Sequence, residues 1–183
     1  MTVDEARNLM HEWVESDALR THMECVAACC GAYATERAPD EHDRWVVTGL
    51  LHDFDYERHP TQDEHPFVGV ARLEELGVDE GIRRAILGHA NYSGVPRDSD
   101  LARVLFAVDE LAGFIVACAK VRPNGIADLK AKSVKKKLKD KRFAAAVSRE
   151  DIEQGIEELG VDRDEHIDRC INAIRAESDR LGV

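Results

Sequence analysis

The sequence predicts an all-α, single-domain helical bundle, and three features support that prediction. Apolar residues recur at helical spacing along almost the whole chain, and no stretch alternates like a strand for long. Glycine, proline and short polar residues stand where helices should begin and end. The 183 residues, 44% of them hydrophobic, suffice for one well-packed core but are too few for two.

Three helices are expected in the first third of the chain. They cover about Val3 to Val14, Asp17 to Ala34 and Glu41 to His52, and Pro39 marks the break before the third. A polar loop follows, from Asp53 to His65. The third helix therefore delivers a histidine and an aspartate together at its end.

Three more helices are expected in the middle of the chain. Pro66 suits a first helical position, and the apolar pattern behind it stops at Gly77. Asp79 is a candidate N-cap for a helix that runs to about His89. After a loop that begins at Asn91, the strongly apolar stretch from Asp100 to Lys120 predicts a long helix at the centre of the bundle.

The composition changes beyond Gly125. A basic stretch precedes Ser148 and Asp151, which resemble a capping box for a short helix ending at Gly160, and one last amphipathic helix extends to Leu181. We therefore expect residues 1–125 to form a helical core. Residues 126–183 should form a C-terminal helical extension that packs on it within the same domain.

Composition limits the classes of function. The formal net charge of −11 argues against a general nucleic-acid binder, because such affinity comes mainly from Lys and Arg on phosphates. The N-terminus lacks the apolar core of a signal peptide, and no run approaches the length of a membrane span. The odd number of cysteines, in apolar patterns without a C-x-x-C pair, suggests buried thiols in a reducing compartment. We expect a cytoplasmic protein with no membrane contact.

The basic segment from Lys130 to Arg142 allows two interpretations. It could bind nucleic acid, but a charged helical face whose Val134 and Leu138 pack inward explains it at least as well. Its lysines could pair with the acidic surface around Glu153 and neighbouring glutamates. We expect this part of the chain to cover the bundle or to contribute to a homodimer.

Six residues of metal-ligand type lie in or beside the apolar patterns: His22, His52, Asp53, His65, His89 and Asp109. Taken singly, each histidine fits a hydrogen-bonded structural role, and Asp109 could pair with Arg20 or Arg103. A carboxylate in a helix as apolar as LFAVDELA costs several kcal/mol unless it is paired or bound to metal. Four imidazoles and two carboxylates suit Fe, Mn, Zn, Co or Ni better than calcium, and no thiolate supports a closed structural zinc site.

The order of these residues resembles the H…HD…H…H…D signature of the HD-domain superfamily of metal-dependent phosphohydrolases. The resemblance covers about Asp17 to Lys120, and LLHDFD, HPFVGV and AVDELAGF are similar to the segments around the signature residues. It implies one metal held by His22, His52, Asp53 and Asp109. It also implies that Asp53 bridges to a second metal held by His65 and His89, and that a metal-activated water or hydroxide attacks a phosphate ester.

The resemblance implies a small phosphorylated substrate such as a nucleotide, without distinguishing a phosphomonoesterase, a phosphodiesterase or a pyrophosphohydrolase. Asp55 and Tyr56 stand where several families of the superfamily have Gly and Lys, so no particular family's substrate can be transferred. Arg58 could hold a phosphate and His59 could act as a general acid, although solvated loop residues are an equal alternative. The competing interpretation is a catalytically silent metal- or nucleotide-binding regulatory module with the same fold.

Overall fold

A computed structural model describes all residues, 1–183, and confirms the all-α prediction, with ten α-helices, two short 3₁₀ turns and no strand. The helices are α1 Val3–Trp13, α2 Asp17–Arg37, α3 His42–Leu51, α4 Phe67–Glu75, α5 Glu80–His89, α6 Asp100–Lys120, α7 Ala131–Leu138, α8 Arg149–Leu159, α9 Arg163–Ala176 and α10 Ser178–Leu181. The 3₁₀ turns are η1 Pro39–Glu41 and η2 Asn91–Ser93.

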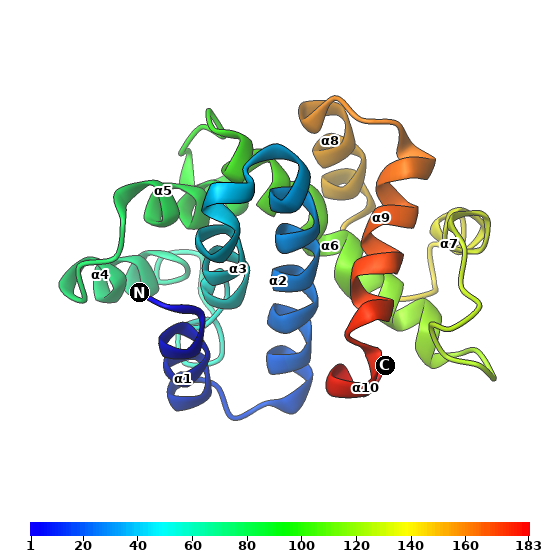
Figure 1. Cartoon of the computed structure of the whole chain (residues 1–183), viewed down its shortest axis with the longest axis horizontal. Helices are drawn as coiled ribbons and strands as arrows, with labels where there is room; N and C mark the ends of the chain where they lie inside the picture. Colours follow the sequence, from blue (N-terminus) through cyan, green and yellow to red (C-terminus); the bar gives the residue numbers. More distant parts are fainter.

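The antiparallel helices α2 and α3 form the tightest pair in the fold (Figure 1). Gly49 permits this approach, because a Cβ atom placed there would lie 2.5 Å from the Cα atom of Ala27. Real side chains do not tolerate such a distance, so any larger residue would push the helices apart. The close contact keeps the end of α3 beside the first half of α2.

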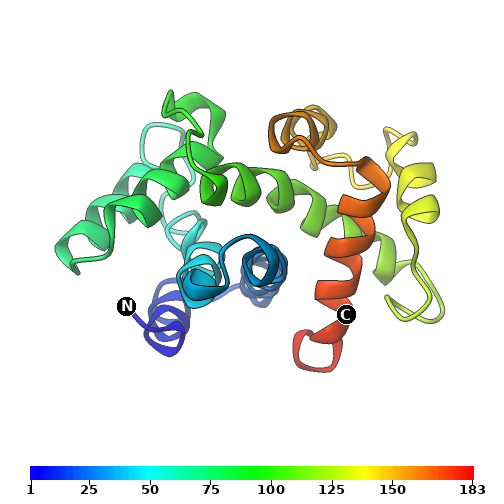
Figure 2. The same cartoon turned by 45° about the horizontal axis from the view of Figure 1, so that its top comes forward.

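Helix α6 is the centre of the bundle, with the bounds that the sequence predicts. Figure 2 shows it crossing the molecule, with α4 and α5 towards one end and α7 and α9 towards the other. It packs against α2, α5, α8 and α9. One hydrophobic cluster extends through the molecule from Ala6 to Leu181.

A buried histidine ties α9 to the centre of the bundle. His166 donates from Nε2 to the backbone carbonyl of Ala107, 3.0 Å away, and its Nδ1 accepts from the hydroxyl of Tyr33 at 2.6 Å. Both nitrogens thus have partners from different helices, α6 and α2. Burial lowers the pKa of His166 to about 4, so the imidazole is neutral at physiological pH.

Local signals placed most helix ends correctly. Asp79 accepts from the backbone of Ile82, and Ser148 accepts from the backbone of Asp151, so both are N-caps. The structure differs at the C-terminus, where the single amphipathic helix expected to reach Leu181 is two helices, broken at Glu177. There the backbone N–H of Glu177 bonds to the carbonyls of Ile174 and Arg175, which closes α9 with a tighter turn.

The basic segment packs along the edge of α9. Lys135 pairs with Asp164 at 2.6 Å, whereas Glu153 pairs with Arg163 and Glu158 with Arg97. The expectation that the lysines pair with the glutamates around Glu153 is therefore wrong for Glu153 and Glu158, because arginines hold both. No helix combines the length and the apolar character that crossing a membrane would require.

Candidate metal centre

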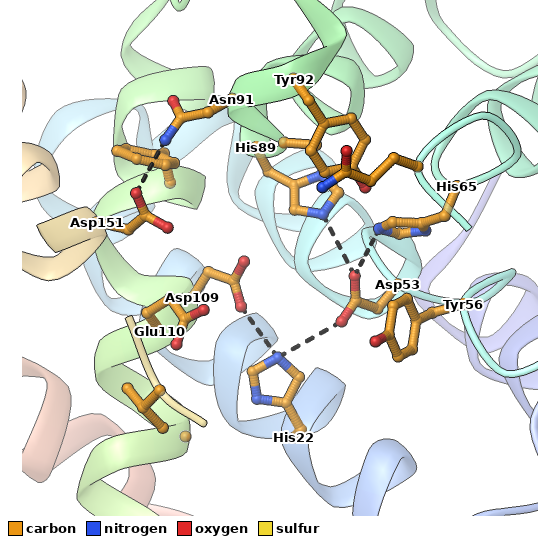
Figure 3. A pocket seen from close by; sticks show the side chains of 15 residues that line it. His22, Asp53, Tyr56, His65, His89, Asn91, Tyr92, Asp109, Glu110 and Asp151 are labelled. Atoms are coloured by element: carbon orange, nitrogen blue, oxygen red, sulfur yellow. Dashed lines mark hydrogen bonds and ion pairs between the residues drawn. The ribbon is translucent and has the colours of Figure 1, made fainter. Parts of the chain in front are cut away.

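The fold brings all six ligand-type residues into one cluster. Figure 3 shows His22, Asp53, His65, His89 and Asp109. His22 comes from α2, His52 and Asp53 follow the last residue of α3, His65 precedes α4, His89 is the last residue of α5, and Asp109 lies midway along α6. Ends or faces of five helices thus converge, although the residues span 88 positions from His22 to Asp109. We define His22, His52 and Asp53 as the first triad, and Asp53, His65 and His89 as the second triad; within each, the candidate ligand atoms lie within 4.8 Å of one another.

Asp53 presents one carboxylate oxygen to each triad. Its Oδ1 lies 3.3 Å from Nε2 of both His65 and His89. Its Oδ2 lies 3.5 Å from Nε2 of His52 and 3.9 Å from Nε2 of His22. A carboxylate divided in this way has the arrangement of a ligand shared between two neighbouring cations.

Asp109 adds a second carboxylate to the first triad. Its Oδ1 lies 3.0 Å from Nε2 of His22 and 3.4 Å from Nε2 of His52. The arginines considered as alternative partners bind elsewhere: Arg20 donates to backbone carbonyls in and after α1, and Arg103 to those of Arg97 and Asp98. The carboxylate of Asp109, in the apolar helix α6, thus has imidazoles as its partners and not an arginine.

Three of the imidazoles are oriented by a hydrogen bond from their outer nitrogen. Nδ1 of His52 donates to the carbonyl of Gly49 at 2.8 Å, and Nδ1 of His89 donates to the carbonyl of Ile86. Nδ1 of His65 lies 2.8 Å from the carboxylate of Asp55. These bonds select the neutral tautomer that carries its proton on Nδ1, so the lone pair of each Nε2 faces a carboxylate oxygen. The Nε2 atom and the oxygen are both acceptors, and their approach is favourable only with a cation between them.

The pKa shifts point to the same need for positive charge. Burial opposes protonation of His52, but the carboxylates of Asp53 and Asp109 outweigh it and raise its pKa well above the ordinary value. His65 behaves likewise: against burial, its hydrogen bonds to Asp53 and Asp55 raise its pKa to about 9. Desolvation opposes the ionisation of Asp53 and Asp109, yet the neighbouring imidazoles hold their pKa values below the ordinary range. The nitrogen and oxygen donors therefore fit divalent transition metals.

Asp55, which in the sequence departs from the pattern of related families, contacts a candidate metal ligand in the structure. Its side chain is 1% exposed and uses both oxygens: Oδ1 bonds Nδ1 of His65, and Oδ2 accepts from the backbone N–H of Gly69 at 2.7 Å. Gly69 makes room for it, since a Cβ there would lie 2.7 Å from the Cγ of Asp55. No sequence signal pairs Asp55 with His65, because the intervening loop decides which side chains meet.

A cavity of about 530 Å³ opens over this cluster. Its polar lining comprises His22, Asp53, Tyr56, Gln62, His65, His89, Asn91, Tyr92, Asp109, Glu110 and Asp151, and its other lining residues are Ala90, Phe106, Gly113 and Val147. The ring of Tyr56 stands edge-on to that of His65, with the ring centroids 5.1 Å apart. Asn91, Glu110 and Asp151 were missed.

The missed residues belong to one wall of the cavity, formed by η2, α6 and α8. Asn91 donates to Oδ1 of Asp151 at 2.9 Å, and Glu110 accepts from the backbone N–H of Ser148 at 3.0 Å. Burial, with the nearby charge of Asp109, raises the pKa of Glu110 to about 7. These contacts join elements some 40 to 60 residues apart, so only the packing of α8 on α6 reveals the wall.

Arg58 and His59 lie outside the cavity. Arg58 donates to the backbone carbonyl of Glu12 and its guanidinium stands 4.8 Å from the ring centroid of Trp13. His59 lies 3.4 Å from the carboxylate of Glu64. The turn that follows Asp53 directs both side chains towards α1 and its own loop, so proximity in sequence to the metal ligands does not bring them to the site.

The comparisons with known proteins gave one match. A family model described as the HD domain matches residues 19–113, which are 95 of the 183 residues and include all six candidate ligands. Neither the curated proteins nor the solved structures contain a match to the chain.

Proposed function

Because this chain belongs to the HD-domain superfamily of metal-dependent phosphohydrolases, we propose that it hydrolyses a small phosphate ester with two divalent metal ions. One ion is held by the first triad together with Asp109. The other is held by the second triad. Asp53 is the ligand common to both.

The division of the Asp53 carboxylate is the observation that carries this proposal. A mononuclear site would need only the first triad and Asp109, and would leave Nε2 of His65 and His89 facing a carboxylate oxygen without a cation between them. The oriented imidazoles of His65 and His89 instead support a second ion on the Oδ1 side of Asp53.

Divalent cations in the two triads would lower the pKa of a bound water molecule, so that it can attack phosphorus, and would neutralise charge on the phosphoryl oxygens. The side chains of the protein position the metal ligands. Asp53 fixes the spacing of the two triads, and the bonds from Nδ1 of His52, His65 and His89 hold each Nε2 towards the cluster. Glu110 and Asp151 line the side of the cavity where the leaving group would lie.

Metal content tests the proposal directly. The wild type should bind about two ions per chain, the double variant His65→Ala/His89→Ala about one, and Asp53→Ala close to none. His59→Ala is the matched control, because it removes an imidazole from the same loop outside the cavity and should leave the content unchanged.

Hydrolysis of p-nitrophenyl phosphate, measured with each metal content, completes the test. Activity should require the ions and should fall by at least ~100-fold in the double variant. Wild-type protein with two ions, no phosphatase activity and tight binding of a nucleotide would instead support the regulatory module. About one ion, unaffected by the double substitution, would refute the binuclear site.

A further inference from the structure

The charge of the cavity wall restricts the substrate. We infer that the site takes esters with a single phosphate, carried by a neutral, hydroxyl-bearing group, in preference to di- and triphosphates. This inference rests on the proposed function, since it concerns the part of the substrate that the metal ions do not hold.

No lysine or arginine lines the cavity. Its ionisable groups outside the candidate ligands are the carboxyl groups of Glu110 and Asp151 and the phenols of Tyr56 and Tyr92. A phosphate at the metal centre has its charge balanced by cations, whereas a second or third phosphate would extend along a wall whose ionisable groups are the carboxyl groups of Glu110 and Asp151. Arginine and lysine are the side chains that proteins use to hold phosphate, and here the wall lacks both.

Arg97, which contacts Asn91 of the wall, does not supply the missing positive charge. Arg97 stands behind the wall, with its Nε and Nη2 on the two oxygens of Glu158 at 2.6 and 2.7 Å. Its Nη1 donates to the carbonyl of Gly88 and to Oδ1 of Asn91, and its guanidinium lies 3.7 Å from the ring centroid of Phe106. All three guanidinium nitrogens of Arg97 therefore already have partners. Through its bond to Oδ1, Arg97 orients the side chain of Asn91.

The wall instead suits donors of hydrogen bonds. Arg97 fixes the amide of Asn91, whose nitrogen donates to Oδ1 of Asp151. Asp151 and Glu110 thus present carboxyl oxygens from α8 and α6 on the side of the cavity opposite Asp53 and His65 (Figure 3). Hydroxyl groups donate to such oxygens, and phosphate oxygens are repelled by them.

The cavity has the size and the rim for such a leaving group. Its volume of about 530 Å³ lies within the range of small-molecule sites. Tyr56 and Tyr92 line it and are 45% and 44% exposed, so their rings are free to contact a flat or apolar face of the ligand. A nucleoside monophosphate or a sugar monophosphate meets these requirements with its one phosphate at the metal centre.

The experiment compares the mono-, di- and triphosphate of one nucleoside with the metal-loaded enzyme. Loss of each substrate is followed by anion-exchange chromatography, which detects cleavage at any phosphorus, and p-nitrophenyl phosphate is assayed in parallel. We expect kcat/KM for the monophosphate to exceed that for the triphosphate by at least ~10-fold.

Two charge-neutralising variants link the preference to the wall. Glu110→Gln and Asp151→Asn should each lower the ratio of kcat/KM for monophosphate over triphosphate by ~3-fold or more, because each removes a carboxyl group from the path of the additional phosphates. Glu153→Gln is the matched control on α8: it removes the same charge, but Glu153 pairs with Arg163 outside the cavity and should leave the ratio unchanged.

The outcomes separate this inference from the proposed function. Metal-dependent hydrolysis of p-nitrophenyl phosphate, with the triphosphate cleaved as fast as the monophosphate or faster, would overturn the inference and leave the phosphohydrolase standing. An equal change of the ratio in Glu153→Gln would also overturn it, since the effect would then come from general surface charge. No hydrolysis of any substrate by the metal-loaded enzyme would overturn both.

Discussion

Asp55→Asn tests whether an oriented histidine is required for the second metal ion. The aspartate is buried and has two partners, Nδ1 of His65 at 2.8 Å and the N–H of Gly69 at 2.7 Å, both of which donate to it. An asparagine offers one acceptor oxygen and one donor NH₂ group, so it can satisfy only one of them.

Either orientation of the new amide disturbs the site. If its oxygen accepts from Gly69, its NH₂ group faces His65 and favours the tautomer with the proton on Nε2, which removes the lone pair that would bind metal. If its oxygen accepts from His65, a buried N–H of Gly69 faces an NH₂ group, and the charge-assisted character of the bond to His65 is lost. A hydrogen bond to a charged group contributes about 1.5–3 kcal/mol. Loss of such a partner typically weakens metal binding by about 10- to 100-fold.

The assay is competition for metal between the protein and a fluorescent chelator, which resolves the two binding steps. We expect the affinity of the step assigned to the second triad to fall by ~10- to 100-fold in Asp55→Asn, while the step assigned to the first triad and Asp109 changes by less than ~3-fold. Asp63→Asn is the control, because Asp63 is an exposed carboxylate in the same loop. Wild-type affinity at both steps, in a variant whose thermal unfolding shows a folded protein, would refute the role assigned to Asp55.

Three other outcomes follow from the structure. The folded-state pKa of His166, about 4, lies below its ordinary 6.5, so the unfolded chain binds the proton first and stability should fall as the pH drops from 6.5 towards 4. By pH 5 the loss attributable to His166 should reach ~2 kcal/mol, and urea unfolding at pH 7 and pH 5 should show a smaller pH effect in His166→Gln if this is correct. Gly49→Ala would place a Cβ 2.5 Å from the Cα of Ala27 and should destabilise the fold by roughly 1–3 kcal/mol, so an unchanged midpoint of thermal unfolding would contradict the contact between α2 and α3. Arg58→Ala should leave kcat/KM for p-nitrophenyl phosphate within ~2-fold of the wild type, because the guanidinium faces Trp13 and not the cavity. A ~10-fold loss would show that Arg58 takes part in the reaction.

The sequence alone determined the helices, because the interactions that begin and end a helix are local. The long apolar pattern from Asp100 to Lys120, and the caps at Asp79 and Ser148, involve residues at most four positions apart, and the structure has them as predicted. The prediction of one continuous C-terminal helix was wrong because it relied on apolar spacing alone. That spacing continues to Leu181, although a turn at Glu177 divides the segment into α9 and α10.

The sequence also indicated which residues gather, since histidines and a buried aspartate in apolar helices need partners. It could not determine their geometry. Only the packing of α3 against α2 and of α5 against α6 gives Asp53 one oxygen for each triad. The loop after Asp53 turns Asp55 inward to His65 and Arg58 outward to Trp13, and residues this close in sequence carry no local signal for such opposite directions. The cavity wall at Glu110 and Asp151 likewise exists only because α8 packs on α6, so distances across helices, set by the core as a whole, decided the site.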